Sequence, residues 1–577
     1  MADLTISQKL DSIINTKANI KQAIINKGQQ VNDVFDTYAA AIENIQTSPS
    51  VENLDTELNT QDNLLNTQNI TISNISNALN GKSLPGGGSI DGNSVYNLED
   101  FTKNDQYGES ILKYVKVYPT ELDWSNKPFD LSYLFSNCQY MTSVPNITNF
   151  DGFNTYTDII ETFKNCKSLT EININLNNTV GFGSMSYAFC NCQNLKTINF
   201  IQPNSFLQED MGADNDLAST FSGCWNLTNI NIDNGLLTPW SIDSTFANCF
   251  NITDLSNFTL NVYGISTNPV STFSNCYNLV NFPIFENKSE YPINLISGMF
   301  QGCEYIDSNT LSNILNHFNL DNVTDIVASF CGCVNLNSIP SELNYDNIVH
   351  MTHAFCGINV QDINLSVSNA ISLQGAFTGS YYKWNTNTQS EVLVTVNTPL
   401  TNLTLTNCSN IQYMAEMCVD CKNLRSVNIS NLSTNLYQCG YVFSNCQNLT
   451  NVAFNDCNFN NVYNTVYMFT NCYNLVDCPN ISTLSNSLQQ TDYMFANCYN
   501  LVNVPTLNME QVHSATNMFE NCYNLSNQSL ENILNMRPVQ VGYTYSYFGI
   551  TENQFNIMKN LPSFQNAVNN GWSETYI

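Results

Sequence analysis

The sequence has few charged residues and very few cations. Only 11% of its 577 residues are charged, and 18 Lys+Arg stand against 48 Asp+Glu, which gives a formal net charge of −30. A surface of this sign repels phosphate backbones, so nucleic acid is excluded as an expected partner. Asn, Ser and Thr supply most of the polarity, and the hydrophobic fraction of 43% argues against a disordered chain.

Segments that direct a chain to a membrane are also absent from the sequence. No apolar run approaches the roughly 18 residues that a helix needs to cross a bilayer. The start, MADLTISQKLDSIINTKANIKQ, has no apolar stretch behind a basic cluster. We therefore expect no membrane insertion, and we expect synthesis in the cytoplasm with release by a route other than secretion.

Motifs for metal binding and catalysis are scarce. Four histidines are too few for repeated Cys/His zinc sites, and no GxSxG, P-loop or HExxH motif occurs. His350 and His353 lie three residues apart without an evident third ligand, so a surface or partly buried pair is favoured over a metal site. We expect no catalytic residue, no metal and no cofactor, although two scattered carboxylates could still meet in three dimensions.

One phrase recurs along the chain, as MFTNCYNL at 468–475, MFANCYNL at 494–501 and MFENCYNL at 518–525. Outside a gap after Cys333, its cysteines follow one another at 24 to 32 residues. In almost every copy, Phe stands three residues before the cysteine and Asn or Gly just before it, usually with Leu or Ile three after. The cysteines are Cys138, Cys166, Cys192, Cys224, Cys249, Cys276, Cys303, Cys333, Cys421, Cys446, Cys472, Cys498 and Cys522.

Two stretches in the gap fit the phrase without its cysteine. AFCGINV at 354–360 and AFTGS at 376–380 carry Ile358 and Ser380 in its place. A period of about 25 residues is typical of leucine-rich repeats, in which each coil adds a short strand and a return segment to a solenoid. The segment after the Leu is the expected strand, as in LKTI at 195–198 and LVNVP at 501–505.

The residue type at each position of the phrase has a structural explanation. One coil cannot bury its apolar face alone, so Phe, Cys and Leu should stack on the same residues of the next coil. Cysteine suits this position as a small hydrophobe, and Asn or Gly suits a tight turn in which Asn can bond backbone groups of a neighbouring coil. We expect the cysteines to pack rather than react. Cys190, Cys331 and Cys356, directly after the Phe, are expected on another side of the coil as partly buried thiols.

The phrase resembles the BspA-like leucine-rich repeat, a variant with F-x-N-C-x-x-L in each unit, from about residue 130 to residue 530. Such repeats occur in bacterial surface adhesins, mycoplasma lipoproteins and some phage and prophage tail proteins. The resemblance implies a binding protein rather than an enzyme. We expect no signal peptide or lipoprotein start, and in this the chain would depart from the secreted adhesins.

Residues 1–48 are predicted to form a helical attachment module of two helices. The sequence KANIKQAIINKG…VFDTYAAAIENI resembles a segment near the ends of tail and fibre proteins from phages of low-GC bacteria. This resemblance implies attachment to other virion proteins through these helices. The alternative is a small helical cap.

Residues 49–82 are predicted to form a coiled-coil stalk. Sustained heptads require a seam buried against other copies. Mixed Leu and Ile with Gln61 and Gln68 at two d positions favours a homotrimer over a dimer. The alternative, one amphipathic helix packed on the solenoid, is disfavoured by the Gly-rich linker at 83–100. The apolar heptad positions are Val51, Leu54, Leu58, Leu65, Ile72, Ile75 and Leu79.

Some regions depart from the repeat pattern, as expected helices or as an insertion. Helices are expected within 307–320 and within a C-terminal cap, residues 528–577, at 529–536 and twice within 551–572. The insertion FTGSYYKWNTNTQSEVLVTVNTPL at 377–400 carries the candidate ligand-binding residues Tyr381, Tyr382 and Trp384. Aromatic faces near amides suit carbohydrate. The alternative is that these aromatic side chains pack over an irregular pair of coils.

Together these patterns predict a repeat solenoid at 101–527, made of short parallel strands with irregular or helical returns, behind a helical anchor and coiled coil. We expect a non-enzymatic fibre or appendage of a bacteriophage particle, on the tail or the head. It would be exposed on the virion and bind a host surface glycan or protein. The alternatives are a bacterial surface adhesin of the same repeat family, a capsule depolymerase fibre and a cytosolic scaffold.

Overall fold

The computed structural model describes residues 121–123, 131–148, 156–175, 181–201, 216–232, 235–386, 388–481, 487–536 and 544–576. All of them belong to one compact unit, residues 85–577. The helical anchor, the heptad positions and the Gly-rich linker lie outside the described residues. Within the described ranges, no helix has the length and apolar character needed to span a membrane.

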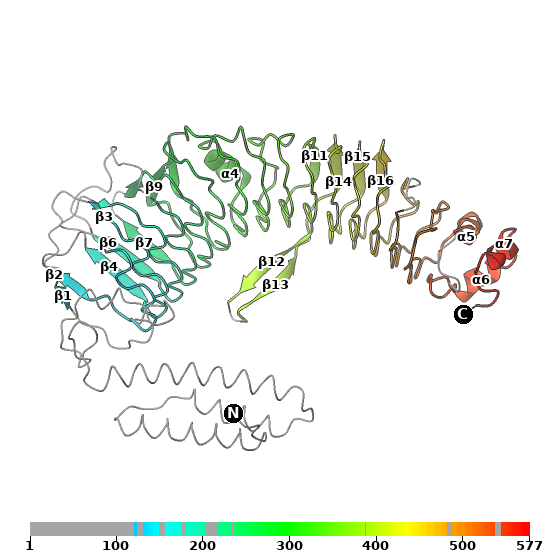
Figure 1. The fold of residues 1–577 in the computed structure, drawn as a ribbon, viewed down its shortest axis with the longest axis horizontal. Coiled ribbons are helices and arrows are strands. Elements are labelled where there is room, and N and C mark those ends of the chain that lie inside the picture. Colours follow the sequence, from blue (N-terminus) through cyan, green and yellow to red (C-terminus); the bar gives the residue numbers. More distant parts are fainter. Residues whose placement is uncertain are drawn as a thin grey trace, which may run out of the picture. The chain divides into compact units, whose positions relative to one another are not determined.

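Short parallel strands lie side by side from coil to coil (Figure 1), as the repeat pattern predicts. Their side chains stay in register, so Val427 of one coil lies opposite Val452 of the next, and both are buried. LVNVP at 501–505 contributes a single bridge at Asn503 rather than a strand. The parallel sheets are β1 (Glu121–Asp123) with β2 (Asn146–Thr148); β3 (Tyr156–Thr157) with β5 (Gly181–Phe182); β4 (Glu171–Asn175), β6 (Thr197–Ile201) and β7 (Asn229–Ile232); β8 (Gly235–Leu237), β9 (Phe258–Asn261) and β10 (Ile284–Glu286); and β11 (Asp362–Ser366), β14 (Asn402–Thr406), β15 (Ser426–Ser430) and β16 (Asn451–Asn455).

A column of stacked phenylalanine rings fills the interior. Phe469 is fully buried, and its ring centroid lies 5.5 Å from those of both Phe443 and Phe495. The column is interrupted at Cys418, which stands in the Phe position of its coil and is also fully buried. The rings of the first run are Phe135, Phe163, Phe189, Phe221, Phe246, Phe273, Phe300, Phe330, Phe355 and Phe377.

Backbone hydrogen bonds join each coil to the next at the same place. The N–H of Phe469 donates to the carbonyl of Met494 at 2.8 Å, and the N–H of Phe495 donates to that of Met518 at 2.9 Å. The coils without the phrase's cysteine follow the same rule, because the N–H of Phe355 donates to the carbonyl of Ala376. The ladder therefore runs from Phe135 through Cys418 to Phe519 without a missing coil.

The residue before the cysteine makes the turn that its identity suggested. Asn471 has φ 61° and Asn497 has φ 63°, a left-handed conformation that asparagine and glycine tolerate best. The side chains also form a ladder, because the amide of Asn497 donates to the side-chain oxygen of Asn471 at 2.8 Å and that of Asn521 to Asn497 at 2.7 Å. The next Asn of the phrase bonds backbone in some coils, as Asn524 does to the carbonyl of Tyr499 at 2.8 Å, and a side chain in others, as Asn500 does to the side-chain oxygen of Asn474 at 3.3 Å.

Helices form where the sequence predicts them. The helix α4 (Ser308–Leu315) begins after Asp307, whose carboxylate accepts a hydrogen bond from the N–H of Thr310. The cap contains α5 (Asn527–Leu534), α6 (Glu552–Met558) and α7 (Phe564–Asn569). The side chain of Gln554 joins α6 to the last coil by donating to the carbonyl of Cys522 at 2.7 Å.

Candidate functional site

The repeat cysteines point into the solenoid and bond the preceding coil. The thiol of Cys472 donates to the carbonyl of Phe443 at 3.2 Å, and that of Cys498 donates to the carbonyl of Phe469 at 3.1 Å. Burial raises the pKa of both thiols above its usual value. All cysteines are free, and of these only Cys457 and Cys478 are partly exposed. A buried, protonated thiol that already donates a hydrogen bond has little tendency to react.

Residues of the expected insertion form an antiparallel hairpin, β12 (Ser380–Asn385) and β13 (Ser390–Thr395) (Figure 1). Tyr381 on β12 is only 5% exposed, and its hydroxyl donates to Glu304 Oε1 at 2.8 Å. Its ring lies where two coils have glycine, since a Cβ on Gly332 or on Gly357 would approach the ring carbons to 2.9 Å. Tyr381 is therefore a packing residue of the hairpin.

The next residues of β12 hold it to earlier coils. The Nζ of Lys383 lies 2.6 Å from Glu304 Oε1 and 4.6 Å from the ring centroid of Tyr277. The N–H of Trp384 donates to the hydroxyl of Tyr277 at 2.9 Å, and its half-buried ring lies 6.2 Å from Trp225. Of the three predicted ligand-binding residues, Tyr381 and Trp384 thus pack on the coils, as the alternative reading expected.

Tyr382 has the opposite orientation on β12. Its side chain is 62% exposed, and it pairs across the hairpin with Leu393, which is 55% exposed. Alternate residues of a strand face opposite sides, which explains why Tyr381 and Tyr382 differ; Trp384 has the same alternation as Tyr382, yet its ring lies 6.2 Å from that of Trp225. Tyr382 therefore remains accessible to a ligand, whereas Tyr381 does not.

A cysteine–histidine pair lies beneath the hairpin. Cys356 Sγ is 3.6 Å from His353 Nδ1, and Cys331 and Tyr381 close the same cluster. Burial raises the pKa of Cys356, but hydrogen bonds with Cys331 and His353 and the charge of His353 outweigh burial and lower that pKa to about 6. Contact with the sulfur in turn raises the pKa of His353. Cys356 is 2% exposed, so this cysteine–histidine pair is closed to a substrate.

The contact between Cys356 and His353 predicts how the thiolate absorbance of the protein depends on pH. We expect the ultraviolet absorbance of a thiolate to appear in the native protein with a midpoint near pH 6, and to be absent from Cys356→Ala. His353→Gln should move the midpoint upward, because the imidazolium that stabilises the thiolate is removed. A spectrophotometric titration of the three proteins checks this. A native protein without thiolate absorbance below about pH 8.5, the ordinary range of cysteine, would contradict it.

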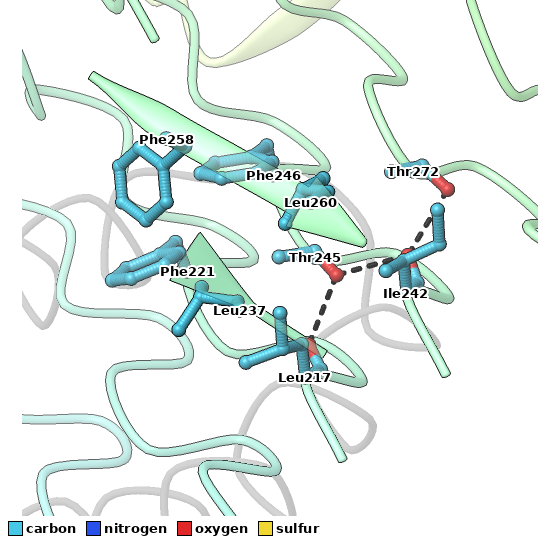
Figure 2. Close-up of a pocket in the computed structure, with 9 residues that line it drawn as sticks. All are labelled: Leu217, Phe221, Leu237, Ile242, Thr245, Phe246, Phe258, Leu260 and Thr272. Carbon is cyan, nitrogen blue, oxygen red and sulfur yellow. Dashed lines mark hydrogen bonds between the residues drawn. The ribbon is translucent and has the colours of Figure 1, made fainter. Parts of the chain in front are cut away.

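A small cavity of about 10 Å³ lies between neighbouring coils (Figure 2). Its lining is almost entirely apolar, with Phe221, Phe246 and Phe258 among the side chains. The hydroxyl of Thr245 already donates within the coils, being 3.0 Å from the carbonyl of Leu217. A volume near the lower limit for one water, without a free polar group, makes this cavity a packing gap rather than a ligand site.

The histidine pair does not gather other ligands. In the ranges that the structure describes, no group of three or more His, Cys, Asp or Glu side chains could hold a metal ion. His350 takes part in a second column of parallel bridges, between Asp325 and Ser372, and His353 faces Cys356. A CxxC pair at Cys418 and Cys421 is buried in the same way as the other repeat cysteines.

The described coils coincide with matches to a known repeat family. The model of the BspA type leucine rich repeat region matches residues 131–218, 217–324, 386–476, 416–540 and 466–568, which together make up more than half of the chain. This chain belongs to the BspA-type leucine-rich-repeat family. A second model, for a Mycoplasma protein of unknown function, matches residues 294–397.

Other comparisons add little to this BspA-type assignment. No curated protein matches the chain. A leucine rich cell surface protein of Faecalibacterium prausnitzii is 14% identical, over 74% of this chain and 88% of its own, with a TM-score of 0.29. A chain of the Toll–Spatzle complex of Drosophila is 15% identical, over 75% of this chain and 52% of its own, with a TM-score of 0.19. At such TM-scores neither structure supports an argument about function.

The last BspA-type coils carry two columns of tyrosines at their surface. Column A is Tyr441, Tyr467 and Tyr493, two residues before the Phe, with ring centroids 4.8 Å apart at both steps. Column B is Tyr473, Tyr499 and Tyr523, directly after the cysteine, with steps of 5.1 Å and 6.3 Å. In the two coils that carry both tyrosines, Asn471 and Asn497 stand between them in sequence, and Tyr523 of the following coil donates to the side-chain oxygen of Asn521.

These columns are the surface feature that the repeat analysis missed. Tyr499 is 41% exposed and Tyr523 is 59% exposed, so their rings reach solvent while the neighbouring cysteines are fully or almost fully buried. The signal was present in the phrase, because MFANCYNL and MFENCYNL both contain this tyrosine. Alignment of the repeats on the cysteine gave a role to the buried positions and gave none to the exposed positions.

Proposed function

We propose that this chain is a non-enzymatic fibre or appendage protein of a bacteriophage particle and binds a cell surface through its BspA-type solenoid. The observation that carries the proposal is the unbroken ladder from Phe135 to Phe519, which gives a long, regular surface with the repeat cysteines inside. Such a surface suits contact with a large partner. The pair of Cys356 with His353 is enclosed beneath the hairpin.

The attachment and oligomer parts of the proposal rest on sequence patterns. Residues 1–48 would attach the chain to other virion proteins, and the heptads at 49–82 would form a homotrimer. A trimer would present three solenoids to the same surface, which raises the strength of attachment without any new contact.

The test of the oligomer compares masses in solution. We expect the full chain to be a trimer and a chain that starts at Gly86 to be a monomer, as measured by light scattering. Leu65→Lys should dissociate the full chain, because it places a charge in the heptad seam, whereas Asn66→Lys at the adjacent outward position should leave the trimer intact. Monomers throughout would remove the support for a fibre.

A second measurement separates the fibre from the bacterial adhesin of the same family. Antibodies raised against the solenoid are applied to the producing culture after lysis and viewed by electron microscopy. Labelled particles support the virion assignment. Label on intact cell envelopes, with unlabelled particles, would replace it with the adhesin.

A further inference from the structure

The residue directly after the repeat cysteine forms one row along successive coils. In the coils beneath the hairpin, this row is Trp225, Phe250, Tyr277 and Glu304. The aromatic members contact one another, with ring centroids 5.9 Å apart for Trp225 and Phe250 and 5.4 Å apart for Phe250 and Tyr277. The row is therefore a continuous aromatic strip that ends in a carboxylate.

Strand β12 lies along this strip. Tyr381 and Lys383 both reach Glu304, and Trp384 reaches Tyr277 and Trp225, so later residues of the strand contact earlier coils. The strip uses three kinds of contact: an ion pair, a ring face beneath an ammonium, and a tyrosine hydroxyl that accepts a backbone N–H. Within this protein, the row therefore already binds an extended strand that carries basic and aromatic side chains.

The same row is uncovered in the last coils, where it consists of column B. Tyr277 under the hairpin is 5% exposed, against 41% for Tyr499 and 59% for Tyr523. The column B rings already stack on one another, so little side-chain freedom remains to be lost when a partner binds. Tyrosine beside asparagine is also the composition that serves recognition surfaces well, because it combines a rigid amphipathic ring with adaptable hydrogen bonding.

Charge selects the partner. Residues 426–536 contain no Lys or Arg and six Asp or Glu, so this stretch has a negative formal charge. A basic segment is attracted to such a surface, and an acidic polymer is repelled. The carboxylates are Asp456, Asp477, Asp492, Glu510, Glu520 and Glu531.

We propose that column B is a docking site for an extended segment of a partner protein that carries basic and aromatic side chains. The inference rests on the proposed binding role of the solenoid and gives that role a place and a class of partner. One feature differs from the hairpin's site. Tyr381 lies over Gly332 and Gly357, whereas Asn497 and Asn521 occupy the corresponding turns, so the partner would lie on the amide ladder. Each amide there has a second N–H that can meet a backbone carbonyl.

The test uses a fluorescent peptide with the sequence GSYYKWNT, residues 379–386, titrated with the full chain and followed by anisotropy. We expect saturable binding that weakens at least about tenfold in the double variant Tyr499→Ala with Tyr523→Ala. The peptide with Lys383→Glu should bind worse by a similar factor. The matched control, Tyr263→Ala with Tyr291→Ala, removes tyrosines that are 55% and 49% exposed outside the column, and it should bind as the native chain does.

Folding is controlled separately. Tyr523→Phe keeps the ring and removes only the hydroxyl, so it should keep most of the affinity, and thermal melts of all variants should coincide. Equal affinity of the native chain and the double variant would place the peptide elsewhere, for example in the hairpin's own site, and overturn the proposal. Absence of saturable binding up to about 1 mM would do the same.

A glycan is the rival occupant. Binding of a neutral β-1,4-linked N-acetylglucosamine hexamer that is lost in the double variant, without peptide binding, would assign column B to carbohydrate and overturn the peptide proposal. The outcome is distinct from that of the proposed function. Light scattering and particle labelling do not involve column B, so a failed peptide titration with trimeric, particle-bound protein removes this inference alone.

Discussion

Phe469→Ala is expected to lower the free energy of unfolding by about 3–5 kcal/mol. The ring is fully buried and contacts the ring of Phe443 on one side and that of Phe495 on the other. Its truncation therefore weakens two coil interfaces, and the stability of a solenoid is close to a sum of coil and interface contributions. A denaturant titration gives the change in free energy, and hydrogen exchange shows that the loss is centred on these coils.

Two variants make the result specific to the phenylalanine column. Phe469→Leu keeps most of the buried volume and should cost less than about 1.5 kcal/mol. Tyr382→Ala removes an aromatic ring that is 62% exposed and should change stability by no more than about 0.5 kcal/mol. If Phe469→Ala cost no more than Tyr382→Ala, the stacked rings would not be what joins the coils.

The interior could be predicted from the repeat phrase, because the residue at each buried position packs in the same way from coil to coil. Phe355 and Phe377 lie in the column although their coils lack the cysteine, and Ile358 and Ser380 are buried in its place, as the aligned phrase indicated. One role of the cysteine went beyond the prediction. Packing alone would accept alanine, but the thiol of Cys472 also donates to the carbonyl of Phe443, a bond that only the structure reveals.

The docked hairpin could not be predicted from local pattern. Lys383 and Glu304 are separated by 79 residues along the chain, and nothing near either residue indicates the other. The glycines under Tyr381 were visible in FCGC and AFCGI, where most other coils have Asn at this position. In sequence they fit a tight turn equally well. The same glycines also leave room for an aromatic ring. This could not be predicted, because the ring comes from β12, which packs on coils that do not directly precede it in the sequence.

Exposure was the other quantity that the sequence did not provide. Tyr277 and Tyr523 occupy the same position of the phrase, yet one is covered by β12 and the other reaches solvent. The repeat fixes where this side chain lies on a coil, and the rest of the chain decides whether the place is free. The two tyrosines therefore have the same local sequence and different accessibility to a partner.

Trp572→Ala is expected to destabilise the C-terminal cap by about 3–5 kcal/mol. The ring is 4% exposed and packs on Tyr545 and Phe548, with centroids 4.9 Å and 4.8 Å away. Its Nε1–H donates to the carbonyl of Met536 at 3.1 Å, which joins the end of the chain to the residues after α5. Since Phe519 bonds the cap through the carbonyl of Phe548, loosening the cap exposes the apolar end of the last coil.

The expected readout is a lower melting temperature with concentration-dependent aggregation, because an uncapped solenoid presents apolar surface to other copies. Light scattering during a thermal melt measures both. Tyr576→Ala is the matched control, since this ring lies in the same cap but is 38% exposed, and its hydroxyl makes one bond, to the carbonyl of Ile550. Trp572→Ala that melts and stays dispersed like Tyr576→Ala would show that the last coil is stable without this closure.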